Sequence, residues 1–164
     1  MHWCVNCILV TILLLLSANG GPVLAQTFLK HHYVYPVDAG LKWFDGHRVL
    51  GRSKTWRGMI FAILATTLTA SLLGLNPIIG VWFALLSMLG DLLASFCKRR
   101  LGKQESSRAR GLDTVPESLL PVWVLEDSLL LNYVDIALIV LLFFLIEEFI
   151  SPILYQWHIR RRPY

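Results

Sequence analysis

The positions of the basic residues constrain this chain more than any other feature of its sequence. All 15 lysines and arginines lie in three short segments, 30–57, 98–110 and 160–162. The intervening stretches 1–29, 58–97 and 111–159 contain none and are rich in Leu, Ile and Val. Long apolar runs, in a chain that is 55% hydrophobic, are typical of an integral membrane protein.

The same charge pattern predicts how the chain crosses the membrane. Short loops rich in Lys and Arg remain on the cytoplasmic side, so the three basic segments are expected to share that side. Apolar segments at about 7–29, 58–75, 78–97, 117–133 and 134–157 give the required even number of crossings between them. We therefore predict an all-α integral membrane protein with about five transmembrane helices, N-terminus outside and C-terminus cytoplasmic, forming a single domain over residues 1–164.

The N-terminal segment carries two signals that need interpretation. Asn19-Gly20-Gly21-Pro22 is expected to kink or end the first helix. Because the first seven residues hold no Lys or Arg, we interpret the segment at about 7–29 as a retained helix, although Val23-Leu24-Ala25 is similar to a signal-peptide cleavage site. Cys4 and Cys7 have a spacing found in metal and redox pairs, but we interpret them as small apolar residues at a helix start.

Asp91 is a charged residue inside an apolar segment. A carboxylate at the centre of a membrane helix costs about 2.5–3.5 kcal/mol on insertion scales. Asp91 precedes Lys98 by seven residues, which places it roughly 10 Å inside the basic face at about 1.5 Å per residue. Ser87, Asp91, Ser95 and Lys98 recur at helical spacing and share one side of the helix. That side is expected to face a hydrated cavity.

The two longer basic segments add cations and further carboxylates. Lys54 and Arg57 stand at the start of an apolar segment, where a helix N-terminus also favours anions; their charge alone fits equally well a flank that only fixes topology. In the second segment, Lys98 and Arg99 precede Asp113 and Glu117. Carboxylates of this kind suit Mg²⁺, and lysines beside them suit a phosphorylated substrate with a soluble part and a lipid part.

Two motifs resemble a known family. Gly90-Asp91-Leu92, followed by Ser95 and Lys98-Arg99, is similar to the signature of CTP:phosphatidate cytidylyltransferases. Lys54-Thr55-Trp56-Arg57-Gly58 is similar to the first motif of the same group, and the whole stretch 45–58 resembles most the CDP-archaeol synthases and their bacterial relatives. The resemblance covers residues 38–120, about half of the chain.

The resemblance implies a Mg²⁺-dependent transfer of CMP from CTP to a membrane lipid phosphate, of the phosphatidate or archaetidate type, with release of pyrophosphate. It implies catalytic roles for Asp91, Asp113, Lys98 and Lys54, and a metal held by Asp91 and Asp113. It also implies substrate binding by Lys54, Thr55, Arg57, Ser95, Lys98 and Arg99. The expected partners are CTP, the lipid phosphate and the bilayer, without nucleic acid, at the cytoplasmic face of the inner membrane.

One departure from the family pattern bears on the metal site. The family carries Asp-x-x-Asp in the second loop, whereas here Asp113 is followed by Pro116 at the second position. Glu117 is the next residue and is expected to serve as the missing ligand. The alternative is a catalytically silent membrane-interaction protein on the same fold.

Other interpretations fit less well. A CDP-alcohol phosphotransferase needs Asp-Gly-x-x-Ala-Arg and further aspartates on one helix, which the stretch 45–58 and the following segment lack. A transporter is disfavoured because the sequence shows no internal repeat. Glu147 and Glu148 lie inside the last apolar segment, and they suit either a functional role or helix packing.

Overall fold

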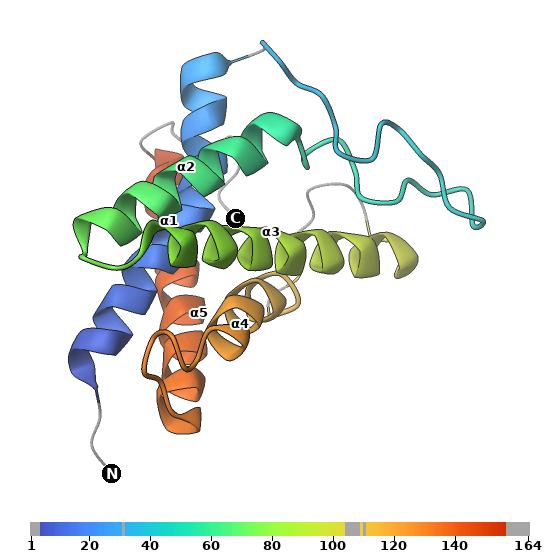
Figure 1. Ribbon diagram of the computed structural model, residues 1–164. Coiled ribbons are helices and arrows are strands. Elements are labelled where there is room, and N and C mark those ends of the chain that lie inside the picture. Colours follow the sequence, from blue (N-terminus) through green and yellow to red (C-terminus); the bar gives the residue numbers. More distant parts are fainter. Residues whose placement is uncertain (1–3, 31, 104–108, 110, 157–164) are drawn as a thin grey trace.

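The computed structural model describes residues 4–30, 32–103, 109 and 111–156, with side chains to residue 149. Its regular elements are five helices in the order α1 (Val5–Leu29), α2 (Trp56–Leu72), α3 (Pro77–Arg100), α4 (Thr114–Val124) and α5 (Tyr133–Gln156). In Figure 1, α2 and α3 form a hairpin packed across α1, and α4 lies against α3. The all-α prediction is confirmed for these residues. The basic segment Arg160–Arg162 lies outside them.

Two described helices, Val5–Leu29 and Pro77–Arg100, are long and apolar enough to cross a bilayer. The fourth predicted segment differs more from expectation, because α4 has 11 residues and turns follow it from Leu125 to Leu130. At about 1.5 Å per residue, such a helix is roughly half the thickness of the hydrocarbon core. The number of crossings and their orientation therefore stay predictions.

Local sequence signals account for most helix ends. Thr55 caps α2 by accepting a hydrogen bond from the Gly58 N–H at 3.4 Å, and Asn76 caps α3 by accepting one from Ile78 at 3.0 Å. Pro77 occupies the first turn of α3, where its missing N–H costs nothing. The last turn of α3 contains Lys98, Arg99 and Arg100, although these residues were predicted to lie in a loop. The helix continues through them because cations are favoured at a helix C-terminus.

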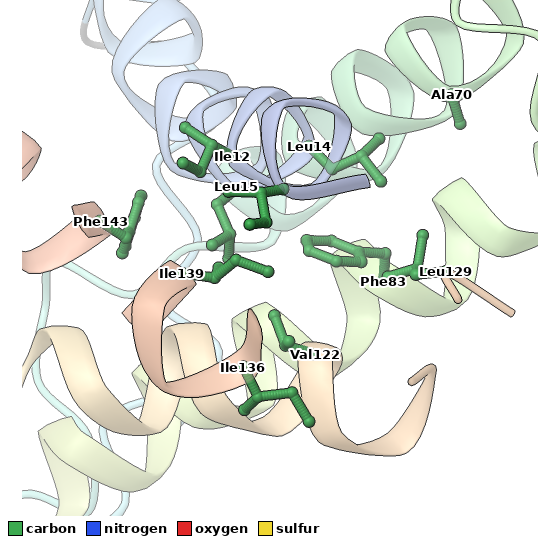
Figure 2. Packing of buried hydrophobic residues seen from close by; sticks show 11 residues of the cluster. Ile12, Leu14, Leu15, Ala70, Phe83, Val122, Leu129, Ile136, Ile139 and Phe143 are labelled. Carbon is green, nitrogen blue, oxygen red and sulfur yellow. The ribbon is translucent and has the colours of Figure 1, made fainter. Parts of the chain in front are cut away.

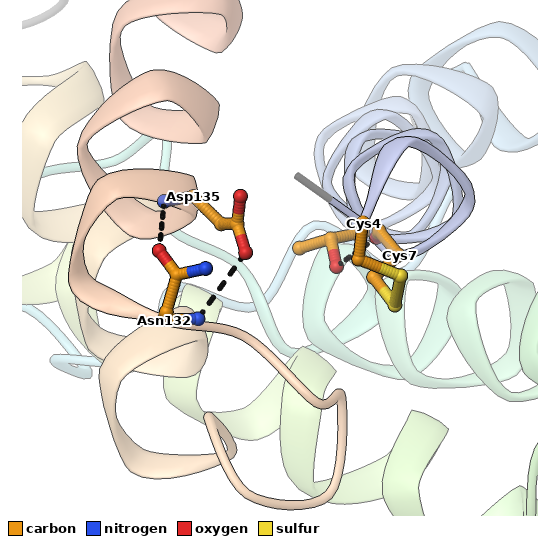
Figure 3. Close-up of a disulfide and its surroundings, with 5 residues drawn as sticks. Cys4, Cys7, Asn132 and Asp135 are labelled. Carbon is orange, nitrogen blue, oxygen red and sulfur yellow. Dashed lines mark hydrogen bonds between the residues drawn. A yellow bond between two sulfur atoms is a disulfide. The ribbon is translucent and has the colours of Figure 1, made fainter. Parts of the chain in front are cut away.

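The N-terminal predictions have mixed outcomes. Pro22 lies inside α1, which continues to Leu29 as the predicted segment does, so the Asn-Gly-Gly-Pro sequence does not end the helix; close packing against α2 supports the helix there. Cys4 and Cys7 are joined by a disulfide rather than being separate apolar side chains (Figure 3). Their spacing at the helix start places the two Cα atoms 5.2 Å apart, within the range that a disulfide spans.

The start of α5 is fixed by a reciprocal cap (Figure 3). The Asn132 side chain accepts a hydrogen bond from the Asp135 N–H at 3.0 Å, and the Asp135 carboxylate accepts one from the Asn132 N–H at 3.3 Å. Further along α5, Glu147 and Glu148 are partly buried, and each has an interaction partner.

The hydrophobic core lies where α1, α3, α4 and α5 meet (Figure 2). Leu14 and Leu15 of α1, Phe83 of α3 and Ile139 of α5 are fully buried there. Small residues permit close crossings around this core. A Cβ atom at Gly21 would lie 2.6 Å from the Ala62 backbone nitrogen, and one at Gly80 would lie 2.7 Å from the Thr67 Cα. Glycine at these positions lets α2 pack against both neighbours.

Two adjacent glycines of α1 test this packing. We expect Gly21→Ala to lower the free energy of unfolding by about 1–3 kcal/mol, because the methyl group would overlap the α2 backbone. Gly20→Ala is the matched control, since a Cβ there meets nothing within 4 Å. The control is expected to gain up to about 1 kcal/mol from helix propensity. Equal melting temperatures for both variants in detergent would contradict the close crossing.

Candidate functional site: an ionic cluster at the end of α3

Lys54 immediately precedes Thr55, the N-cap of α2, and hydrogen bonds fix the position of its main chain. Its C=O accepts a hydrogen bond from Val37 at 2.8 Å, and the next ladder bond joins the Trp56 N–H to the Tyr35 C=O at 3.1 Å. Pro36 and Thr55 form an antiparallel bridge between these bonds. The segment 35–37 therefore fixes the direction in which the Lys54 side chain leaves the chain.

The Lys54 ammonium binds Asp91, the carboxylate that the sequence placed inside an apolar helix. The Nζ atom donates to both oxygens, at 2.6 Å to Oδ1. Both side chains are about one fifth exposed, which leaves the pair only partly hydrated. A carboxylate in an apolar helix needs a cation nearby, and Lys54 of the first loop supplies that cation to Asp91.

Several carboxylates act on this one ammonium. Burial works to lower the pKa of Lys54, but the charge and hydrogen bond of Asp91 outweigh it, with further contributions from Glu117 and Asp113. The pKa therefore lies above its ordinary value of 10.5. Its contribution to stability is complete below that value and is lost only as the pH rises above it, so Lys54 is charged at neutral pH. Of the predicted site residues, Asp91 thus binds Lys54 directly, and the charges of Glu117 and Asp113 act on it as well.

A second pair lies beside the first. The Lys98 Nζ atom lies 2.6 Å from Asp113 Oδ1, and Asp113 Oδ2 accepts a hydrogen bond from the Ala109 N–H at 3.0 Å. Lys98 belongs to the last turn of α3, and Asp113 directly precedes α4. This pair joins the two helices at the end where Ser95 and Arg99 are also buried.

Gly90 brings α4 against α3. A Cβ atom at Gly90 would overlap the Pro116 carbonyl group and would lie 2.7 Å from the Glu117 Cα. Glu117 is 6% exposed, in the first turn of α4. The Gly-Asp sequence therefore has two functions, since glycine admits the α4 backbone and the following aspartate faces Lys54.

Arg57 has a different environment from Lys54. Its Nη1 atom donates to the main-chain carbonyls of Lys30 at 2.9 Å and His32 at 2.6 Å, and the residue is 9% exposed. The guanidinium thus ties the start of α2 to the chain leaving α1, whereas Lys54 faces Asp91. The predicted phosphate contacts of Arg57, Thr55, Ser95 and Arg99 stay predictions.

Two residues that sequence patterns do not single out, Asp38 and Arg100, shape the first loop. Asp38 is buried and accepts hydrogen bonds from the loop residues Gly40, Arg48, Leu50 and Gly51. Arg100 donates to the Asp45 carboxylate and the Arg48 carbonyl, both at 2.9 Å, and stacks on the Trp43 and Phe96 rings. An aspartate whose side chain accepts a hydrogen bond from the residue two positions later, as Asp38 and Asp45 do here, is typical of a turn. The spacing of residues in the sequence does not predict the arginine that each aspartate binds.

The carboxylates of this cluster are candidate ligands for a metal ion. Among the described side chains, no three histidine, cysteine, aspartate or glutamate residues are already arranged around a common metal position. Asp91 and Asp113 instead each bind a lysine. Carboxylate oxygens are nevertheless the hard ligands that a divalent cation prefers, so the chemistry of these side chains fits such an ion, although lysines now bind two of them.

Fold and site together define a helical membrane protein in which two lysines pair with two aspartates at the end of an apolar helix. The family model described as CarS-like, CDP-archaeol synthase, matches residues 4–164. The chain therefore belongs to the CDP-archaeol synthase family, as its motifs predicted.

Individual relatives agree with this membership. The CDP-archaeol synthase of Hyperthermus butylicus is 42% identical over 104 residues, covering 60% of this chain and 59% of that protein. The matched region is thus less than two thirds of that relative. The CDP-archaeol synthase of Sulfolobus acidocaldarius is 33% identical, and the alignment covers 79% of this chain and 83% of that protein. The CDP-archaeol synthase of Sulfurisphaera tokodaii is 29% identical, and the alignment covers 91% of this chain and 90% of that protein.

A solved structure of an intramembrane enzyme for archaeal membrane lipids biosynthesis has the same fold. It aligns with a TM-score of 0.67 and 28% identity, over 84% of this chain and 88% of that chain. The likeness supports the assignment of this chain as a membrane protein.

The Lys54–Asp91 pair is testable without a substrate. Lys54→Met and Asp91→Asn each leave a partly buried charge without its partner, and each should lower the free energy of unfolding. The loss of unfolding free energy in the double variant should be smaller than the sum of the two single losses. The difference, measured by denaturant unfolding, should be a coupling energy of about 0.5–3 kcal/mol. The more exposed Asp45–Arg100 pair is the control, with an expected coupling below about 1 kcal/mol. Additive losses for Lys54 and Asp91 would contradict the pair.

Proposed function

We propose that this protein is a CTP-dependent cytidylyltransferase that converts an archaeol-type lipid phosphate and CTP to a CDP-lipid and pyrophosphate. Membership of the CDP-archaeol synthase family supports this assignment. The observation that carries it is the pairing of two lysines with two aspartates where α3, the first loop and α4 meet. Such a cluster offers cations to phosphates and carboxylates to a metal ion in one place.

The reaction needs little covalent chemistry from the protein. An oxygen of the lipid phosphate attacks the α-phosphorus of CTP, the bond from that phosphorus to the bridging oxygen breaks, and the electron pair leaves with pyrophosphate. The attacking oxygen is already anionic, so no strong general base is needed. Lys54 and Lys98 neutralise phosphate oxygens and hold the two anionic reactants in line, which makes positioning and charge stabilisation the main sources of rate.

Asp91, Asp113 and Glu117 would hold Mg²⁺, which when bound supplies charge neutralisation and orientation of the triphosphate. The two lysines exchange partners in this proposal. In the ligand-free protein their ammonium groups bind Asp91 and Asp113, and with substrate present they bind phosphate oxygens instead. The exchange keeps every charge compensated in a site where an unpaired charge is costly.

The depth of the site suits a lipid substrate. Asp91 lies within the apolar helix α3, and Lys98 lies in its last turn. A lipid that stays in the bilayer could bring its phosphate to this level, while CTP enters from the side of the basic loops. The basic segments further support an active site on the cytoplasmic face of the inner membrane, with about five crossings and the N-terminus outside.

An assay with purified protein tests the activity. In detergent, with labelled CTP, Mg²⁺ and an ether-linked isoprenoid lipid phosphate, we expect a labelled CDP-lipid, and less product from ester-linked phosphatidate. Asp91→Asn and Glu117→Gln should each reduce kcat/KM by about 100-fold or more, because each removes a carboxylate from the site. Asp127→Asn, which changes an exposed carboxylate after α4, is the control. A folded wild-type protein without product would support the catalytically silent alternative.

Metal dependence has its own experiment. Chelation with EDTA should abolish product formation, and added Mg²⁺ should restore it. Because lysines and carboxylates are paired before substrate binds, CTP should bind more tightly with Mg²⁺ than without it in calorimetry. Lys54→Met should reduce this difference. Equal affinity with and without Mg²⁺ would argue against the partner exchange.

A further inference from the structure

Asp38 is a buried carboxylate outside the motifs that define the family resemblance. It is 5% exposed, in the loop between α1 and α2. One oxygen accepts hydrogen bonds from the Gly40 N–H at 3.0 Å and the Arg48 guanidinium at 2.9 Å. The other accepts from the Leu50 N–H at 3.2 Å and the Gly51 N–H at 3.1 Å. Both ends of the loop hairpin are thus fastened to one side chain.

These bonds favour the charged form of Asp38. Burial alone would raise its pKa, but the N–H groups of Gly51, Gly40 and Leu50 and the Arg48 charge together lower it below the ordinary 3.8. The stabilisation is present above that value and is lost as the pH falls below it. Asp38 is therefore an anion at neutral pH and accepts hydrogen bonds in that form.

The contacts of Asp38 lead directly to Lys54. Val37, its neighbour in sequence, donates to the Lys54 C=O at 2.8 Å, and the Lys54 N–H donates to the Gly51 C=O at 3.4 Å. The main chain of Lys54 is thus held between the residue before Asp38 and a residue that Asp38 binds. Gly51 adopts a φ of +112°, which other residues rarely adopt, so the turn at this point depends on glycine as well as on the carboxylate.

We propose that Asp38 is a positioning residue of this site, which holds the Lys54 ammonium at the place where it meets Asp91 and the CTP phosphates. The proposal rests on the proposed cytidylyltransferase function for its kinetic consequences. Its structural content, that Asp38 orders the turn carrying Lys54, stands apart from the reaction.

Asp45 provides a matched comparison in the same loop. It also accepts hydrogen bonds from an arginine, Arg100 at 2.9 Å, and from a main-chain N–H two residues on, that of His47 at 3.0 Å. Its contacts anchor the tip of the loop to the end of α3, whereas those of Asp38 anchor the turn before Lys54. A general loosening of the loop would affect both variants, but a positioning role affects only Asp38.

The first measurement is hydrogen–deuterium exchange of the full chain in detergent without ligands. Asp38→Asn should increase deuterium uptake over residues 50–56, because an amide cannot replace a carboxylate that accepts four hydrogen bonds. Asp45→Asn should leave the uptake of these residues unchanged. Equal uptake over 50–56 in both variants would overturn the proposal.

The second measurement is steady-state kinetics. Asp38→Asn should raise the KM for CTP by about tenfold or more, as expected for losing a bond network to a charged group, while Asp45→Asn changes it less than about twofold. In the Lys54→Met background, Asp38→Asn should add little, because its effect passes through Lys54. Additive losses would overturn the proposal.

The proposal stays testable if the Asp38 variant does not fold or if the wild-type protein is inactive. If Asp38→Asn does not fold, Arg48→Met removes one of the same ties and should change uptake and KM in the same direction. If the wild-type protein forms no CDP-lipid, the proposed function fails, and the exchange comparison still decides whether Asp38 orders the turn that carries Lys54.

Discussion

The ion pair between Lys54 and Asp91 is the constraint on which the rest of the site depends. A carboxylate within an apolar helix needs a cation nearby, and α3 supplies its own cations only from Lys98 onward. The hairpin of α2 and α3 solves this problem, because its tight turn at Asn76-Pro77 places the start of α2 beside the far end of α3. The loop before α2 then delivers Lys54 to Asp91.

The ionic groups near this pair form a site that compensates its own charges before any ligand arrives. Lys54 binds Asp91 and is also acted on by the charges of Glu117 and Asp113, and Lys98 binds Asp113. Isolated charges at this depth would be expensive, so paired side chains are the stable resting arrangement. Under the proposed function, a divalent cation and a triphosphate would together replace both halves of each pair, whereas either ligand alone would leave a charge uncompensated.

The sequence predicted the parts of the fold that depend on local pattern. Apolar runs located α1, α2, α3 and α5, Asn76-Pro77 located a turn, and helical spacing placed Asp91 near Lys98. It failed where the outcome depends on contacts between distant residues. The carbonyl partners of Arg57 come from the end of α1, and the Asp38 network joins residues on both sides of a hairpin. Neither spacing nor composition specifies such partners.

The departure at Pro116 can now be interpreted in physical terms. The contact with Gly90 uses the main chain of residues 116 and 117, so it does not require a particular side chain at position 116. Asp113 and Glu117 are four residues apart around the first turn of α4, a spacing that keeps both on one face of a helix. Glu117 is buried, and its charge acts on Lys54. A second acid moved by one residue, with one more methylene group, therefore still places a carboxylate whose charge acts on Lys54.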